Sequence, residues 1–159
     1  MDLNSYYKFG FDEVSAETRY FTGTTEKFTK DQVESYIKKV SVDSTRYDFL
    51  ILKSNEVIGE AVLSEIDGKS CHFRIAIFNK KNFSGGIGFS TTKALLDLVF
   101  GDLGLESIEL EVFPFNKRGI ALYSKLGFKL VSKIIDDEAK EPFREIHMMR
   151  LNKENYVSS

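Results

Sequence analysis

The sequence predicts a mixed α/β domain in which a central, mostly antiparallel sheet carries helices on both faces. Three observations support this prediction. Residues 47–78 contain three strand-like runs separated by turn residues. A glycine-rich stretch at 84–88 and a helical pattern then lead into an alternating strand at 107–113, which is typical of a parallel β-α-β crossover. Two further strand-like runs, at about 128–136 and 144–151, predict a closing hairpin.

Length and composition indicate a single domain, 1–159, and exclude several classes of protein. The chain has 22 Lys and Arg residues against 24 Asp and Glu residues, so no nucleic-acid-binding surface is expected. No apolar run approaches the roughly 20 residues of a membrane span, and the first residues lack the pattern of a secretory signal. Two histidines and one cysteine are too few for a zinc site of the usual spacing, so no metal is expected. The lone Cys71 fits a reducing compartment, and we expect a cytoplasmic protein.

In the first half of the chain, the sequence pattern predicts a helix followed by a three-stranded meander. Thr29 and Gln32 have the spacing of a capping box, so a helix is expected at 29–40. The expected strands are 47–53, 57–66 and 71–78, with a turn at 54–56 between the first two. Asp67-Gly68 predicts a type I′ hairpin turn between the second and third strands.

The second half alternates helices and strands. An apolar stripe predicts a helix at 90–103 that ends at Gly101 and Gly104. After the strand at 107–113, a short helix at 117–126 is expected to stop at Gly127. The polar residues 136–138 form the turn between the last two strands.

The glycine cluster at 84–88 is the most informative feature for function. It follows a strand and precedes a helix, so its free backbone N–H groups and the helix dipole favour a pyrophosphate. A ligand-free turn explains the glycines equally well. An NTPase loop is not expected, because no Gly-Lys-Ser/Thr occurs at the loop. A dinucleotide fold is weakly supported, since Gly86 and Gly88 lie about 20 residues before Glu109 and Glu111, but Thr91 replaces the third glycine.

Two segments contain longer motifs, Phe83–Gly88 (FSGGIG) and Val112–Phe128 (VFPFNKRGIALYSKLGF). They resemble two patterns of the GNAT acyl-CoA N-acyltransferases. The first segment is similar to that family's Q/R-x-x-G-x-G/A loop, and the second matches V-x-x-x-N-x-x-A-x-x-L-Y-x-K-x-G-F. The resemblance covers about residues 20–151 and is nearest to the RimJ/RimL-like and spermidine N-acetyltransferase branch. It implies transfer of an acetyl group from acetyl-CoA to a primary amine, which could be a protein N-terminal amine, a polyamine or another small amine.

The sequence departs from the family pattern at three places. Phe83 occupies the usual Gln/Arg position, so side-chain help to the phosphates is lost there while the backbone donors remain. Gly119 replaces an alanine, which weakens the short helix. The usual first strand is missing, because the chain starts directly at a helix. One edge of the sheet is therefore expected to be open, which favours a homodimer.

The resemblance also implies roles for particular residues. Acetyl-CoA would pair with the strand Ile75, Ala76 and Ile77, where a backbone N–H would polarise the thioester carbonyl. The loop Phe83, Ser84, Gly85, Gly86, Ile87 and Gly88 would hold the pyrophosphate. Asn116 would bond the cofactor, although it is also a suitable helix N-cap, and Arg118 would meet the ribose phosphate or remain a surface charge. Tyr123 is the expected acid that protonates the departing thiolate, with a core tyrosine as the alternative.

The sequence assigns no general base. Glu109 and Glu111 share one strand face and are candidates for a base or for orienting the amine, with a solvent-exposed face as the alternative. His72 is a further candidate base, with a structural role as the simpler interpretation. Two other functions stay open at this point. One is a non-catalytic module that binds CoA or a protein partner, and the other is an NAD-type oxidoreductase.

Overall fold

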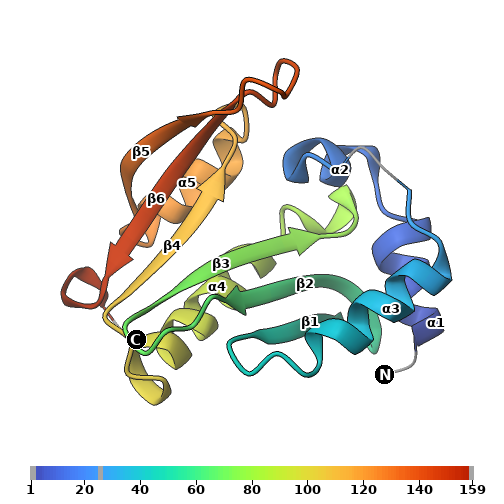
Figure 1. Ribbon diagram of the computed structural model, residues 1–159, viewed down its shortest axis with the longest axis horizontal. Coiled ribbons are helices and arrows are strands. Elements are labelled where there is room, and N and C mark those ends of the chain that lie inside the picture. Colours follow the sequence, from blue (N-terminus) through green and yellow to red (C-terminus); the bar gives the residue numbers. More distant parts are fainter. Residues whose placement is uncertain (1–2, 25–26, 158–159) are drawn as a thin grey trace.

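The structure, a computed structural model, describes residues 3–24 and 27–157. Its centre is a six-stranded sheet in the order β1-β2-β3-β4-β6-β5 (Figure 1). The strands are β1 (Tyr47–Lys53), β2 (Glu56–Ser64), β3 (Ser70–Ile77), β4 (Ser107–Val112), β5 (Lys129–Ile135) and β6 (Glu145–Asn152). All neighbours are antiparallel except β3 and β4, which are parallel. The predicted mixed, mostly antiparallel sheet with a β-α-β crossover is confirmed.

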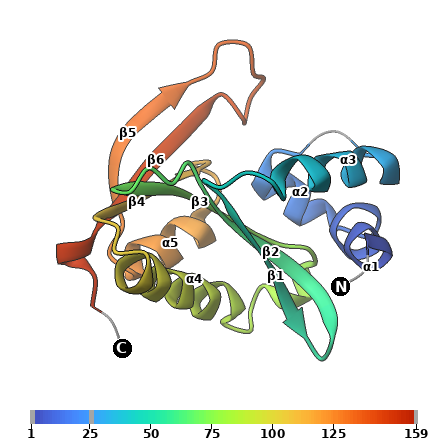
Figure 2. The same ribbon diagram turned by 60° about the horizontal axis from the view of Figure 1, so that its bottom comes forward.

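Helices cover both faces of the sheet (Figure 2). On one face lie α1 (Leu3–Tyr7), α2 (Ala16–Thr22) and α3 (Lys30–Val40), and on the other lie α4 (Ile87–Asp97) and α5 (Lys117–Lys125). Each side has its own apolar core. The larger core packs Leu96 and Val99, at the end of α4 and just after it, against inward-facing strand residues such as Phe73 and Ile108. The smaller core joins the N-terminal helices to β2 and β3. In the described part of the chain no helix is long and apolar enough to cross a membrane.

The sequence pattern predicted the start of α3 correctly, but it predicted one turn at the wrong position. The Thr29–Gln32 capping box forms, with both reciprocal hydrogen bonds present. The predicted type I′ turn at Asp67-Gly68 is wrong, because only Gly68 of the pair has a positive φ and β2 already ends at Ser64. Asp67 Oδ1 instead accepts from the N–H groups of Lys69 and Ser70, which closes a wider loop. The two-residue turn with positive φ at both positions is Ser54-Asn55, between β1 and β2.

Helix α4 begins three residues earlier than predicted. Gly86 adopts a left-handed conformation (φ 73°) and its C=O accepts from the Ser90 N–H at 2.9 Å, so Ile87 and Gly88 belong to the first helical turn. A π-helical turn, Leu98–Asp102, extends the helix, and the left-handed Gly104 ends it. The phosphate-binding segment predicted as a loop is therefore half loop and half helix N-terminus.

The first strand of the described chain is β1, and the described residues before it are helical or irregular. This agrees with the expectation of a missing first strand. β1 consequently forms one edge of the sheet, with Leu50 and Leu52 exposed.

Candidate active site

The sheet opens between its two parallel strands. β3 extends to Ile77, but it pairs with β4 only from Ser70 to Phe73. Beyond that point the two strands diverge, and the gap between them is plain in Figure 1. A strand whose edge is freed in this way presents a row of backbone donors and acceptors to whatever enters the gap.

The backbone register decides which groups face the gap. Phe78 N–H donates to Ile58 C=O on β2 at 2.8 Å. Because hydrogen-bonded positions alternate along an antiparallel pair, the N–H groups of Ile75 and Ile77 point away from β2 and into the gap. The Ile77 C=O already accepts from Thr18 Oγ1 of α2 at 2.5 Å. Helix α2 therefore holds the end of the diverging strand in place.

A cavity of about 550 Å³, named here the gap cavity, lies between β3, the N-terminus of α4 and α5. Ten of the twelve predicted site residues line it: Ile75, Ala76, Ile77, Phe83, Ser84, Gly86, Gly88, Asn116, Arg118 and Tyr123. The other two, Gly85 and Ile87, are in the same segment but are not among the lining residues. The structure thus brings together, around one cavity, residues of the segment 75–88 and residues of the distant segment 116–123.

Sequence reasoning missed part of this lining. Thr18, Phe21 and Thr22 of α2 contribute, as do Phe89 and Lys125, whose Nζ lies 4.9 Å from the centre of the Phe89 ring. No local motif distinguishes the α2 residues. Their contribution depends on how α2 packs on β3, which is a long-range contact.

Arg118 of α5 contacts Phe83. Its guanidinium donates to the Phe83 C=O and lies 5.4 Å from the centre of the Phe83 ring. Because both residues line the gap cavity, Arg118 is placed beside the glycine segment.

Asn116 serves as the N-cap of α5, as its structural interpretation predicted. Its Oδ1 accepts from the Gly119 N–H at 2.9 Å, which leaves the amide nitrogen as a donor in the cavity lining. The cap also explains the glycine at 119, because a Cβ there would lie 2.7 Å from Asn116 Nδ2. The capping and cofactor roles of Asn116 are therefore compatible.

Tyr123 is one of the residues that line the gap cavity. Its side chain is buried, with 9% of the residue exposed, and packs edge-on against Phe128 at 5.8 Å. Burial raises the pKa of Tyr123 to about 12, so the phenol is neutral at physiological pH. The neutral phenol therefore carries the proton that the predicted acid role requires.

A second cavity, of about 370 Å³, adjoins the gap cavity from the side of the N-terminal helices. It lies between α2, α3, β2 and β3, and it is named here the helix-side cavity. Thr18, Thr22 and Ala76 line both cavities. Ala76 therefore lies at the boundary between the two cavities, in the strand segment where the thioester is predicted to bind.

A comparison of the sequence with known protein families identifies the family of this chain. The model of the acetyltransferase (GNAT) domain matches residues 2–129. The chain belongs to the GNAT acetyltransferase family. The dinucleotide alternative loses its support with this result, and Glu109, on which it depended, is paired with Arg150 of β6 at 2.7 Å.

Two further comparisons agree with a GNAT fold. Acetyltransferase PseH of Campylobacter jejuni is 26% identical over 95 residues, and the match spans 60% of this chain and 59% of PseH. The structure of spermidine N-acetyltransferase from Vibrio cholerae in complex with CoA and spermine has a TM-score of 0.82 at 20% identity, covering 98% of this chain and 92% of that one. The crystal structure of C. jejuni PseH has a TM-score of 0.61 at 23% identity, covering 77% and 78%.

The candidate bases from the sequence are placed away from both cavities. Glu109 bonds Arg150, Glu111 is exposed on β4, and His72 lies on β3 beside Glu109. Among the described residues that line the two cavities, Glu60 is the single carboxylate. Within the same described part of the chain, no group of three or more His, Cys, Asp and Glu residues is arranged to hold a metal.

Proposed function

We propose that this GNAT protein transfers the acetyl group of acetyl-CoA to a primary amine. One observation carries the proposal: the gap between β3 and β4 collects two strand N–H groups, the glycine segment and Tyr123 around a single cavity. Family membership supports the same conclusion. The acceptor expected from the sequence is a protein N-terminal amine, a polyamine or another small amine.

The residues around the gap cavity fit acetyl-CoA. The N–H groups of Ile75 and Ile77 would pair with the pantetheine arm as an additional strand would. Gly86 and the first turn of α4 would hold the pyrophosphate, because unpaired N–H groups and about half a positive charge are found at a helix N-terminus. Asn116 and Arg118 would contribute further donors from α5. A solved relative at 20% identity, the V. cholerae spermidine N-acetyltransferase, was crystallised with CoA.

The chemistry assigned to this chain is donation of hydrogen bonds and of one proton. Acetyl-CoA supplies an acetyl group that is already activated as a thioester. A backbone N–H of Ile75 or Ile77 would stabilise negative charge on the carbonyl oxygen. As the amine nitrogen bonds to the acetyl carbon and the carbon–sulfur bond breaks, Tyr123 would protonate the departing sulfur. The amine releases its surplus proton, for which no base is assigned.

Acetyl-CoA binding is tested by a thermal-shift titration, with CoA, NAD and AMP as controls. Acetyl-CoA at 100 times its Kd should stabilise the protein by about 2.7 kcal/mol, and NAD should not. The variant Gly86→Asp should lose the shift, because it places a carboxylate at the phosphate position. Its matched control is Gly104→Asp at the other end of the helix. Both glycines have positive φ and open space for a Cβ, and Asp tolerates that conformation, so both variants should fold.

The outcomes of this titration separate the alternatives. A shift with acetyl-CoA that Gly86→Asp removes and Gly104→Asp keeps supports the proposed site. Binding without transfer to any amine would instead identify a non-catalytic CoA-binding module. The absence of a shift with either CoA species would overturn the proposal.

We also propose that two copies pair along the open β1 edge of the sheet. Tyr47, Leu50 and Leu52 are exposed there, and an edge strand with apolar side chains favours pairing with another chain. Sedimentation should show a dimer for the wild type and a monomer for Leu52→Lys. The control Val42→Lys, just before this strand, should remain dimeric. A wild-type monomer at all concentrations would contradict the proposal.

A cytoplasmic location remains part of the proposal. Cys71 is unpaired and buried in β3, and burial raises the pKa of its thiol to about 12. The thiol is therefore unreactive, and the fold depends on no disulfide of this residue.

A further inference from the structure

The helix-side cavity lies where an acceptor must approach. Arg74 and Ala76 of β3 and Phe78, directly after it, alternate along the chain on the face that carries the N-terminal helices, and all three line this cavity. The gap cavity lies on the other side of β3, and Ala76 lines both cavities. A molecule bound on the helix side would therefore reach the predicted thioester position from the face opposite α4.

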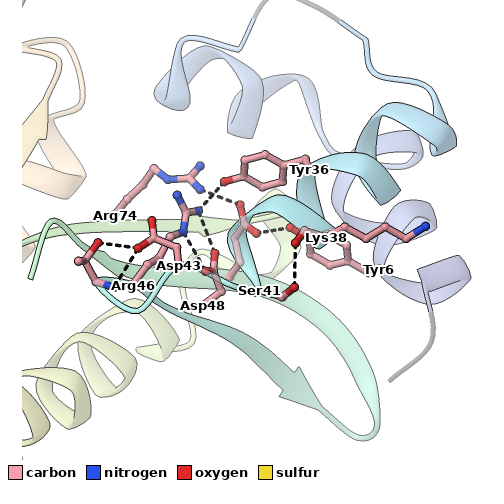
Figure 3. Close-up of polar contacts among 10 residues, drawn as sticks. Tyr6, Tyr36, Lys38, Ser41, Asp43, Arg46, Asp48 and Arg74 are labelled. Carbon is pink, nitrogen blue, oxygen red and sulfur yellow. Dashed lines mark hydrogen bonds and ion pairs between the residues drawn. The ribbon is translucent and has the colours of Figure 1, made fainter.

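The single carboxylate of this cavity is already compensated. The side chain of Glu60 is 15% exposed and lies opposite Ala76 in the register of β2 and β3. It accepts from Tyr6 Oη at 2.5 Å and pairs with Arg74 Nη2 at 3.4 Å; Figure 3 shows Tyr6 and Arg74 at this contact. Burial and the Glu60 charge raise the pKa of Tyr6, so the phenol stays a donor. Both oxygens of Glu60 therefore already have partners within the protein, Oε2 with Tyr6 and Oε1 with Arg74.

Two guanidinium groups of the same cavity keep spare donors. Arg74, 52% exposed, uses one nitrogen on Glu60. Arg19 donates from Nη2 to the Phe11 C=O at 2.9 Å. Each guanidinium has five N–H groups in a planar fork that matches a carboxylate or a phosphate. By contrast Arg46, labelled in Figure 3, is bonded to Asp48 through Nε and Nη2 at 2.8 and 2.9 Å and does not line the cavity.

The described lining thus combines two cations and one anion with aromatic walls. The rings are those of Tyr6, Phe11, Phe28, Tyr36 and Phe78. A polyamine would meet Arg74 and Arg19 as like charges, with the Glu60 carboxylate already occupied. An anionic group on the bound molecule would complete the charge balance instead.

We propose that the helix-side cavity binds the acceptor, and that the acceptor is a small primary amine that also carries a carboxylate or phosphate group held by Arg74 and Arg19. This inference rests on the proposed acetyl transfer and specifies its substrate class. Arg74 is two residues before Ala76, so an anion on Arg74 would leave the amine end of a short molecule near the thioester position.

The test measures binding of matched amines to the CoA-saturated protein, and their acetylation. The panel holds glucosamine and glucosamine 6-phosphate, phenylalaninamide and phenylalanine, and spermidine. We expect the anionic member of one pair to bind at least tenfold more tightly than its neutral partner. The pair that shows the preference identifies the anion as phosphate or carboxylate. Spermidine should be the poorer acceptor.

Variants connect this preference to Arg74. Arg74→Gln should lower kcat/KM for the anionic amine about 10- to 100-fold, mainly through KM, since hydrogen bonds to charged groups contribute about 1.5–3 kcal/mol. It should lower kcat/KM for the neutral amine much less, so that the preference is lost, and it should leave the Kd for acetyl-CoA unchanged. Arg74→Lys should restore part of the loss. The control Arg150→Gln removes a guanidinium that pairs with Glu109 outside both cavities, and it should keep the preference.

The remaining outcomes overturn the inference. An equal or better response to spermidine or to the neutral amines would do so, as would a preference that survives Arg74→Gln. If no panel member binds while acetyl-CoA does, the substrate class is wrong and the proposed acetyl transfer stands. If acetyl-CoA itself fails to bind, the proposed function falls first.

Discussion

Replacing Tyr123 with Phe is expected to lower kcat by about 10²- to 10³-fold while the Kd for acetyl-CoA stays within about twofold. The substitution removes one hydroxyl from a buried ring and keeps its packing against Phe128. Without the phenol, the sulfur would leave as an unprotonated thiolate. Steady-state kinetics with an accepted amine, together with a thermal-shift titration of acetyl-CoA, measure both quantities.

The pH profile gives an independent check of the same role. Because burial raises the pKa of Tyr123 to about 12, the acid form persists as the pH rises and is lost only near that value. The rate should therefore climb with the fraction of deprotonated amine and show no fall up to about pH 10. Tyr156→Phe, which removes a phenol bonded to Asp97 outside both cavities, is the control and should leave kcat unchanged. An unchanged kcat in Tyr123→Phe would show that this phenol is only a core residue.

The parts of the site that depend on local sequence could be predicted. Asn116 and Tyr123 are seven residues apart, which is two turns of α5, so one short helix places both. Gly86 precedes a helix and adopts the conformation that glycine tolerates best. The Thr29–Gln32 capping box also uses neighbouring residues alone. In each case the geometry is set within about two helical turns of chain.

The parts that depend on long-range packing could not be predicted. Thr18 contacts the Ile77 C=O, 59 positions away, and Tyr6 contacts Glu60, 54 positions away. No spacing rule relates such residues, because their distance is set by how the N-terminal helices pack on the sheet. Glu109 is an example in which long-range packing removed a role that the sequence had suggested. It had the spacing of a functional carboxylate, but the register of β4 against β6 places it beside Arg150.

The substitution Gly59→Ala is expected to damage both stability and acetyl-CoA binding. A Cβ at this buried position of β2 would lie 2.5 Å from the Ala76 C=O and 3.1 Å from the Cδ1 atoms of Ile51 and Ile77. A backbone oxygen cannot rotate away as a side chain can, so β3 must shift relative to β2. We expect the free energy of unfolding to fall by about 1–3 kcal/mol, as for overpacked cores, which denaturant titration would measure.

The same shift of β3 should also weaken the binding of acetyl-CoA, because the displaced Ala76 C=O belongs to the strand that faces the gap. Moving Ala76 changes the directions of the flanking N–H groups of Ile75 and Ile77, on which the proposed pairing with the pantetheine arm depends. The Kd for acetyl-CoA should therefore rise at least tenfold at a temperature where the variant is still folded. Gly101→Ala, with open space around the added Cβ, should alter neither quantity. A Gly59→Ala protein that is less stable yet binds acetyl-CoA normally would separate the strand's structural role from the proposed binding role, and the N–H groups of Ile75 and Ile77 would then lose their assignment.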